Sequence, residues 1–258
     1  MSERVRWSYV QARLQARHGD RLDDTAWRML EAARSFDQFL ERSRSTTLHR
    51  FTDTIEVKMP SHTIERILRA AWRDYVAELA TWVTPSWQPA VLWVAHLPDL
   101  PVLDSLLKGA GPGWTREDPV FALFARADLQ EHAAELEASP FAVLLAATDG
   151  SRSLGAQWLA HWRTLWPRSS DNDRRGLDVL VGVVANHFES IARAGLEDSS
   201  SPYRHDLERS ATRVFRRYAG TPAALFSHLT LVALDLERLR GGLVRRLLFD
   251  TANLWKAA

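Results

Sequence analysis

Apolar residues recur every three or four positions along almost every segment of this chain, and strand-type alternation is almost absent. Ile64, Leu68 and Tyr75 follow this spacing in one segment, and Leu177 and Val184 follow it in another. Such a spacing places side chains on one face of an α-helix. The sequence therefore predicts an all-α, multi-helix fold in which each helix buries one apolar stripe.

Caps and breakers mark where these helices begin and end. The pair Asp23 and Asp24 can cap one helix running from 27 to 40, because an aspartate accepts hydrogen bonds from the free N–H groups of a first turn. Asp118 can cap another helix, with Pro119 at its first position. Glycines, including Gly220, indicate helix ends.

The stretch from Asp23 to about Gly109 is echoed later in the chain. Asp24 aligns with Asp118, Glu41 with Glu135, and Ser45 with Ser139. Repeats of this kind are typical of stacked helical units, which commonly bind partners. We therefore expect a first helical lobe over residues 1–110, a second over 111–200, and C-terminal helices over 201–258 that pack back on the lobes.

The strongest periodic signal lies near the C-terminus. Apolar residues there alternate steps of four and three: Leu225, Leu229, Val232, Leu236, Leu239 and Leu243. This seam predicts either a core-facing helix or an intermolecular coiled coil. Gly241 and Gly242 are expected to weaken or bend that helix.

Composition limits the classes of partner and of site. The 33 basic and 32 acidic residues nearly cancel, so no overall field favours nucleic acid or an anionic membrane. Cysteine is absent, which excludes disulfides, thiolate metal sites and cysteine nucleophiles. The charged N-terminus lacks the apolar core of a secretion signal, and the longest unbroken apolar runs, 90–95 and 179–185, fall short of the ~20 residues of a membrane span. We expect a cytoplasmic protein, at most peripheral to a membrane.

Motifs for catalysis or cofactor binding are missing. No histidine has the His-x-x-x-His or Glu-x-x-His spacing of a helical metal site. The glycines at 150 and 155 have the wrong spacing for an esterase elbow, and those from 109 to 113 lack the lysine of a phosphate loop. The sequence predicts no catalytic residue, no metal and no cofactor, and hence a non-catalytic protein.

Trp158, Trp162 and Trp166 stand four residues apart on one predicted helix, with His161 beside them. Three large rings in a row could line a groove that binds a flat ligand or a partner. The same row is also typical of core packing against the next helix. Both interpretations stay open at this point.

Two groups of arginines are candidates for partner contact. The first comprises Arg209, Arg213, Arg216 and Arg217, opposite an apolar stripe of the same helix, and the second comprises Arg238, Arg240, Arg245 and Arg246. Either group is explained by a solvated face or by a docking surface for an acidic protein partner or lipid phosphates.

Short motifs in both halves of the chain are similar to one known family. They are Tyr9-Val10-Gln11-Ala12-Arg13, Ser45-Thr46-Thr47-Leu48, Ile64-Glu65-Arg66-Ile67-Leu68-Arg69, and the closing segment from Leu231 to Arg240. Together they resemble the C-subunit family of V-type and archaeal-type ATPases. The family usually has three lobes, whereas this chain is expected to hold two and a C-terminal part.

The resemblance implies a non-catalytic, cytoplasmic socket that sits on the membrane rotor and receives the central stalk, with other rotary-ATPase subunits as protein partners. Any membrane association would then be peripheral and through a partner. Two other functions stay open: an adaptor in another assembly, and a small-molecule-binding protein or enzyme that uses a tryptophan-lined pocket.

Overall fold

The computed structural model describes residues 3–125, 135, 137–146, 153–194 and 201–254. All regular secondary structure in these ranges is helical, which confirms the predicted all-α fold. The elements are α1 (Glu3–Gly19), α2 (Asp24–Glu31), α3 (Phe36–Arg44), α4 (His49–Thr52), α5 (Ser61–Ala80), α6 (Gln88–Trp93), η1 (Val94–Asp99), α7 (Leu100–Leu107), η2 (Gly113–Arg116), α9 (Ala142–Ala146), α10 (Leu154–Thr164), α11 (Asp171–Ala194), α12 (Ser201–Arg217) and α13 (Pro222–Leu254).

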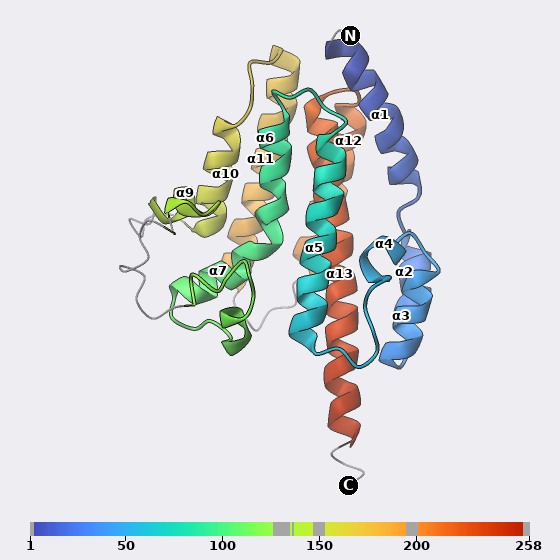
Figure 1. Cartoon of the computed structure of the whole chain (residues 1–258). Helices are drawn as coiled ribbons and strands as arrows, with labels where there is room; N and C mark the ends of the chain where they lie inside the picture. Colours follow the sequence, from blue (N-terminus) through green and yellow to red (C-terminus); the bar gives the residue numbers. More distant parts are fainter. Residues whose placement is uncertain (1–2, 126–134, 136, 147–152, 195–200, 255–258) are drawn as a thin grey trace.

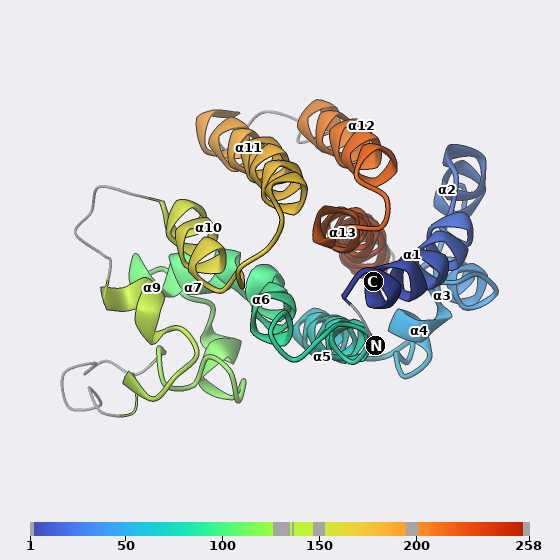
Figure 2. The same ribbon diagram turned by 90° about the horizontal axis from the view of Figure 1, so that it is seen from above.

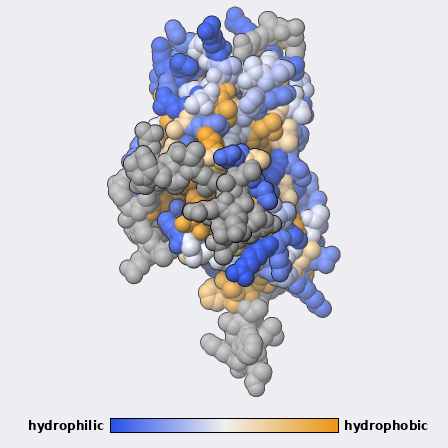
Figure 3. Space-filling model, turned by 60° about the vertical axis from the view of Figure 1, so that its left-hand side comes forward, coloured by the Kyte–Doolittle hydropathy of each residue, from blue (hydrophilic) through white to orange (hydrophobic). Residues whose placement is uncertain are grey.

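Helix α13 runs through the middle of the molecule, and other long helices surround it (Figures 1 and 2). It packs against α11 and α12 on one side and against α1, α3 and α5 on the other. Helices α6 and α10 lie further out, next to α5 and α11. The last turns of α13 extend beyond the other helices, and there Leu248 and Phe249 are exposed. The space-filling view shows apolar area near the lower end of the molecule (Figure 3).

The apolar seam of α13 is a core-facing stripe. Its members are all buried: Leu225, Leu229, Val232, Leu236, Leu239 and Leu243. They join one hydrophobic core with the buried stripe of α5, which includes Trp72 and Leu79. The helix continues through Gly241 and Gly242 as a single element. The seam therefore packs against helices of its own chain.

The segment from 27 to 40 forms two helices, and the prediction of one helix was wrong. Asp23 caps α2 as expected, and its Oδ1 accepts from the backbone N–H of Ala26 at 2.7 Å. A second cap interrupts the pattern, because the side chain of Ser35 accepts from the backbone N–H of Gln38 and starts α3. A serine cap therefore takes precedence over the continuous apolar spacing.

Asp118 does not begin a helix within the described residues. It is buried, and residues 119–125 form turns. Its Oδ2 accepts from Nη2 of Arg69 at 2.5 Å, and its Oδ1 accepts from the backbone N–H of Val120. The predicted side-chain bond to a first-turn N–H is present, but residues 119–125 form turns and not the predicted helix, and the other carboxylate oxygen pairs with Arg69. The lobe boundaries at 110 and 200 stay predictions.

One helical run is long and apolar enough to cross a membrane when judged by length and composition alone. It is Gln88–Leu107, which joins α6, η1 and α7. The sequence prediction, based on unbroken apolar runs, did not include it because His96 ends the run 90–95. Its buried side chains, among them Val91 and Leu103, belong to the core that α6 and α7 share with α5 and α10. The cytoplasmic location stays a prediction.

Candidate functional site

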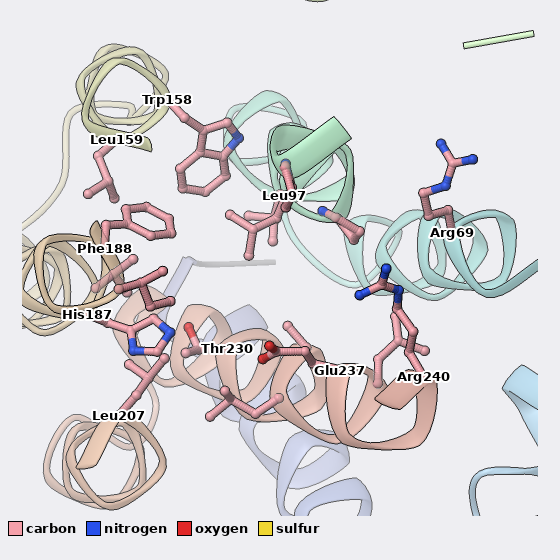
Figure 4. A pocket seen from close by; sticks show the side chains of 18 of the residues that line it. Arg69, Leu97, Trp158, Leu159, His187, Phe188, Leu207, Thr230, Glu237 and Arg240 are labelled. Carbon is pink, nitrogen blue, oxygen red and sulfur yellow. The ribbon is translucent and has the colours of Figure 1, made fainter. Parts of the chain in front are cut away.

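An apolar cavity of about 280 Å³ lies inside the bundle (Figure 4). Helices α10 and α11 form one side, α5 and α13 form the other, and η1 and the start of α7 close a third. Most of its wall is apolar and includes Leu68, Leu97, Trp158, Val184, Phe188 and Leu234. Its volume is close to the lower end of the range for small-molecule sites in proteins.

The wall between α10 and α11 depends on a close approach of the two helices. The side chain of Ser153 accepts from the backbone N–H of Ala156 and fixes the start of α10. Gly155, in the first turn of α10, lies against Phe188 of α11. A Cβ added at Gly155 would lie 2.8 Å from Cδ2 of the Phe188 ring. Only glycine allows this contact without a shift, and the ring of Phe188 then stands beside Trp158 (Figure 4).

The predicted tryptophan row is divided between core and cavity. Trp158 and Trp162 are buried, stack with centroids 6.0 Å apart, and both contribute to the cavity wall. Trp166 packs edge-on against Trp162 outside the cavity. His161 packs against Trp93 with centroids 4.5 Å apart, and burial lowers the pKa of His161. Trp158 and Trp162 therefore belong to the core and also line the cavity, whereas the half-buried Trp166 does not line it.

The tryptophans of α10 and its C-terminal end differ from one another in hydrogen bonding, because Nε1 of Trp162 has a partner, whereas Nε1 of Trp166, like that of Trp158, has none within the described residues. Nε1 of Trp93 donates to the carbonyl oxygen of Trp158 at 3.2 Å, and Nε1 of Trp162 donates to that of Ala90 at 3.1 Å. Nε1 of Trp158 is buried and has no hydrogen-bond partner within the described part of the chain. Its indole ring faces the cavity (Figure 4).

Charged side chains at the edge of the cavity come in opposite pairs. Nη2 of Arg240 lies 2.7 Å from Oε1 of Glu65, and Nη2 of Arg204 lies 3.0 Å from Oε1 of Glu237. Each pair cancels its own charge. The edge of the cavity is thus polar but carries little net charge.

Arg69 also lines the cavity, and its charge is satisfied by two buried aspartates. It pairs with Asp118 and, at 3.3 Å, with Asp99, which also meets Arg73 at 2.9 Å. Burial alone would raise the pKa of Asp99, but neighbouring His96 and the two arginines lower it. Two arginines and two carboxylates form a neutral, buried network that joins α5 to η1 and to the turn at 118.

The arginines of α12 form an exposed face, as their spacing predicted. Arg209, Arg213, Arg216 and Arg217 are exposed, opposite buried Val214. Arg209 pairs with Asp206 at 2.5 Å. The other three make no hydrogen bond or ion pair to any residue that the structure describes.

The arginines of α13 mostly contact their own chain. Arg238 pairs with both carboxylate oxygens of Glu31, and Arg240 pairs with Glu65. Arg246 is buried and donates to the carbonyl oxygens of Glu31 and Ala33, at the C-terminal end of α2. Arg245 is exposed. Three of these four candidates therefore help to hold helices α2 and α5 against α13.

Several cavity residues were missed in the sequence. His187, Glu237 and Arg69 line the cavity, and none of them was predicted as a site residue, although Arg69 and Glu237 lie in segments that resemble the C-subunit family. Val184 was predicted as part of a buried stripe, whereas it lines the cavity together with Phe188. A helical spacing indicates which face turns inward, but it does not show whether the opposite wall is near enough to fill the space.

Among the residues that the structure describes, no group of three or more His, Asp or Glu side chains could hold a metal ion. No known family model, curated protein or solved structure matches the chain. The resemblance to the C-subunit family of rotary ATPases therefore stays a prediction from short motifs.

Proposed function

We propose that this protein binds a small, largely apolar molecule in the cavity between α10, α11 and α13, and that it does so without catalysis. The observation that carries this proposal is the apolar wall of the cavity, which includes Trp158, Trp162 and Phe188. Protein interiors are close-packed, so a cavity of about 280 Å³ deprives its lining of contacts that a ligand would supply. The function would be that of a carrier or a ligand-responsive binding protein.

Binding can be measured with diphenylhexatriene, a neutral apolar compound whose fluorescence rises when it leaves water. We expect saturable binding of one molecule per chain. A Val184→Trp substitution places a larger ring in the wall and should abolish this binding, because the added volume occupies the cavity.

The matched control is Val179→Trp, which adds the same ring to an exposed position of the same helix. It should bind the fluorophore as the wild type does. Unsaturable binding, or equal binding by the Val184→Trp protein, would contradict the proposal. Circular dichroism would verify that both variants keep their helical content.

A second candidate is a non-catalytic coupling or scaffold protein, of the kind that the resemblance to the C-subunit family of rotary ATPases implies. The exposed arginine face of α12 supports it, because Arg213, Arg216 and Arg217 are free of ion pairs within the described chain. Such a face fits an acidic protein partner.

Purification from the native cell tests this second candidate. Recovery of other rotary-ATPase subunits with the protein would support it, provided that these subunits are no longer recovered when the three arginines are changed to glutamate. Recovery of a different defined partner would instead indicate an adaptor in another assembly. Repeated recovery of a free monomer would contradict both.

A further inference from the structure

The cavity is elongated along helix α13. Its wall follows this helix from Phe226, through Thr230 and Ala233, to Arg240. At the helical rise per residue, the step from 226 to 240 spans about 21 Å. A volume of about 280 Å³ along this length describes a narrow tunnel. Such a shape fits one extended chain better than a bulky ring system.

One end of the tunnel is closed and apolar. There the rings of Phe226 and Trp162 meet edge-on with centroids 4.8 Å apart, and both side chains are buried. Leu180 of α11, also buried, completes this end of the wall. A ligand therefore meets only hydrocarbon and aromatic surface at the closed end.

The other end is charged and reaches solvent. Helices α11 and α13 both run from the upper to the lower part of the molecule in Figure 1, so Ile191, Glu237 and Arg240 lie at the same end. All three line the cavity and are exposed. Figure 4 shows Arg69 and Arg240 on the side of the cavity opposite to Trp158. This end is the mouth of the tunnel.

The charges at the mouth are balanced. Glu65 pairs with Arg240, and Glu237 pairs with Arg204, while Arg69 is neutralised by its own aspartates. A head group with a net charge would lose part of its hydration here without gaining a free counter-charge. A head group without net charge avoids this cost.

We infer that the ligand is a single-chain lipid amphiphile whose head group carries no net charge. Its hydrocarbon chain lies along α13 with its end near Phe226 and Trp162, and its head group lies at the mouth beside Glu237 and Arg240. This inference rests on the proposed binding function and adds the chemical class and the orientation of the ligand.

Alkylphosphocholines with chains from octyl to dodecyl test the inference, because they have one chain and a zwitterionic head group. Each is titrated against bound diphenylhexatriene below the concentration at which it forms micelles. Every added methylene that enters the tunnel should strengthen binding about threefold. Dodecanoate and dodecyltrimethylammonium, which carry a net charge, should bind at least about fivefold more weakly than dodecylphosphocholine.

A ring placed halfway along the tunnel tests the position of the chain. Ala233→Phe should keep the binding of the octyl compound and remove most of the gain from longer chains, because the closed half of the tunnel is then filled. The control is Val179→Phe, which adds a ring at an exposed position of α11 and should keep the full gain. An unchanged gain in Ala233→Phe would contradict the inference.

A charge reversal at the mouth tests the position of the head group. Glu237→Lys gives the mouth a net positive charge and should strengthen the binding of dodecanoate about fivefold, with less than about twofold change for dodecylphosphocholine. Glu56→Lys makes the same change at an exposed residue outside the cavity wall and should alter neither affinity. Equal effects of the two variants would contradict a head group at the mouth.

The remaining outcomes separate this inference from the proposed function. If the fluorophore binds but no alkylphosphocholine displaces it, or if affinity does not rise with chain length, the inference fails while the binding function stands. Equal or tighter binding of a charged compound by the wild type also contradicts the inference alone. If the fluorophore itself does not bind, the proposed function and this inference fail together.

Discussion

The phenol oxygen of Tyr75 lies 2.7 Å from Nε2 of His228, and this hydrogen bond joins α5 to α13 in the buried interior. Burial lowers the pKa of His228 to about 3, and the charges of Arg21 and His18 act in the same direction. The imidazole is therefore neutral in the folded protein over the whole range in which an exposed histidine takes up a proton.

Acid should destabilise the protein through His228 before its carboxylates are affected. Above pH 6.5 the ring is neutral in both states, so it adds no pH dependence. As the pH falls below that value, His228 binds a proton in the unfolded chain but stays neutral in the folded chain. The free energy of unfolding therefore falls by up to about 1.4 kcal/mol per pH unit. Urea unfolding between pH 6.5 and about 5 would measure this slope.

His228→Asn should flatten that slope, whatever its effect on stability at higher pH, because asparagine does not titrate. Burial also lowers the pKa values of His18, His161 and His187, which should leave a residual slope of the same sign. His205→Asn, at an exposed position, serves as the control and should keep the full slope. An unchanged slope in His228→Asn would contradict the assignment.

Two tryptophans of the cavity wall should respond differently to the same substitution. Trp162→Phe leaves the carbonyl oxygen of Ala90 without its donor, whereas Trp158→Phe removes an N–H that has no partner. Both changes remove similar apolar area. We therefore expect Trp162→Phe to lower the free energy of unfolding by about 1–3 kcal/mol more than Trp158→Phe does. Equal losses in urea unfolding at neutral pH would show that the indole of Trp158 is satisfied.

Much of the helical pattern could be predicted because it depends on neighbours in sequence. The seam of α13, the stripe of α5 and the cap at Asp23 all follow from spacings of three to four residues. The same holds for the end of α12, where Gly220 adopts φ 76° as a helix-ending glycine often does.

The partners of buried charges could not be predicted, since they are set by contacts distant in sequence. Asp118 had the context of a helix cap, but its carboxylate meets Arg69, which lies on α5. Arg246 belonged to an arginine-rich stretch, yet it is buried against the end of α2. The cavity was hidden for the same reason, because its walls come from helices far apart in the chain.

Arg246 should be important for stability, and its neighbour Arg245 should not. The guanidinium of Arg246 donates to the carbonyl oxygens of Glu31 and Ala33. Because α2 ends at Glu31, no further turn of that helix supplies an N–H donor to these two oxygens. Arg246→Met leaves these acceptors buried without a donor and should lower the free energy of unfolding by about 3 kcal/mol. Arg245→Met, at an exposed position, should change it by less than about 0.5 kcal/mol. Similar midpoints for the two variants in urea unfolding would contradict this contact.

Alanine substitutions at the adjacent residues Gly241 and Gly242 of α13 should change the free energy of unfolding in opposite directions. A Cβ on Gly242 would lie 2.4 Å from Cζ of Phe39, whereas a Cβ on Gly241 meets no atom within 4 Å. Phe39 is fully buried, and the guanidinium of Arg246 lies 4.1 Å from the centroid of its ring, so the ring has little room to move. Gly242→Ala should therefore lower the free energy of unfolding by about 1–3 kcal/mol, despite the better helix propensity of alanine.

Gly241→Ala should instead raise the free energy of unfolding by about 0.5–1 kcal/mol, because it restricts the unfolded chain and adds no clash. Phe39→Leu combined with Gly242→Ala provides a further check. If the clash with the ring is the cause, the smaller side chain should make the loss from Gly242→Ala smaller than in the wild type. Shifts of the same sign for both single glycine variants in urea unfolding would mean that helix propensity, and not the contact with Phe39, determines the choice of glycine at 242.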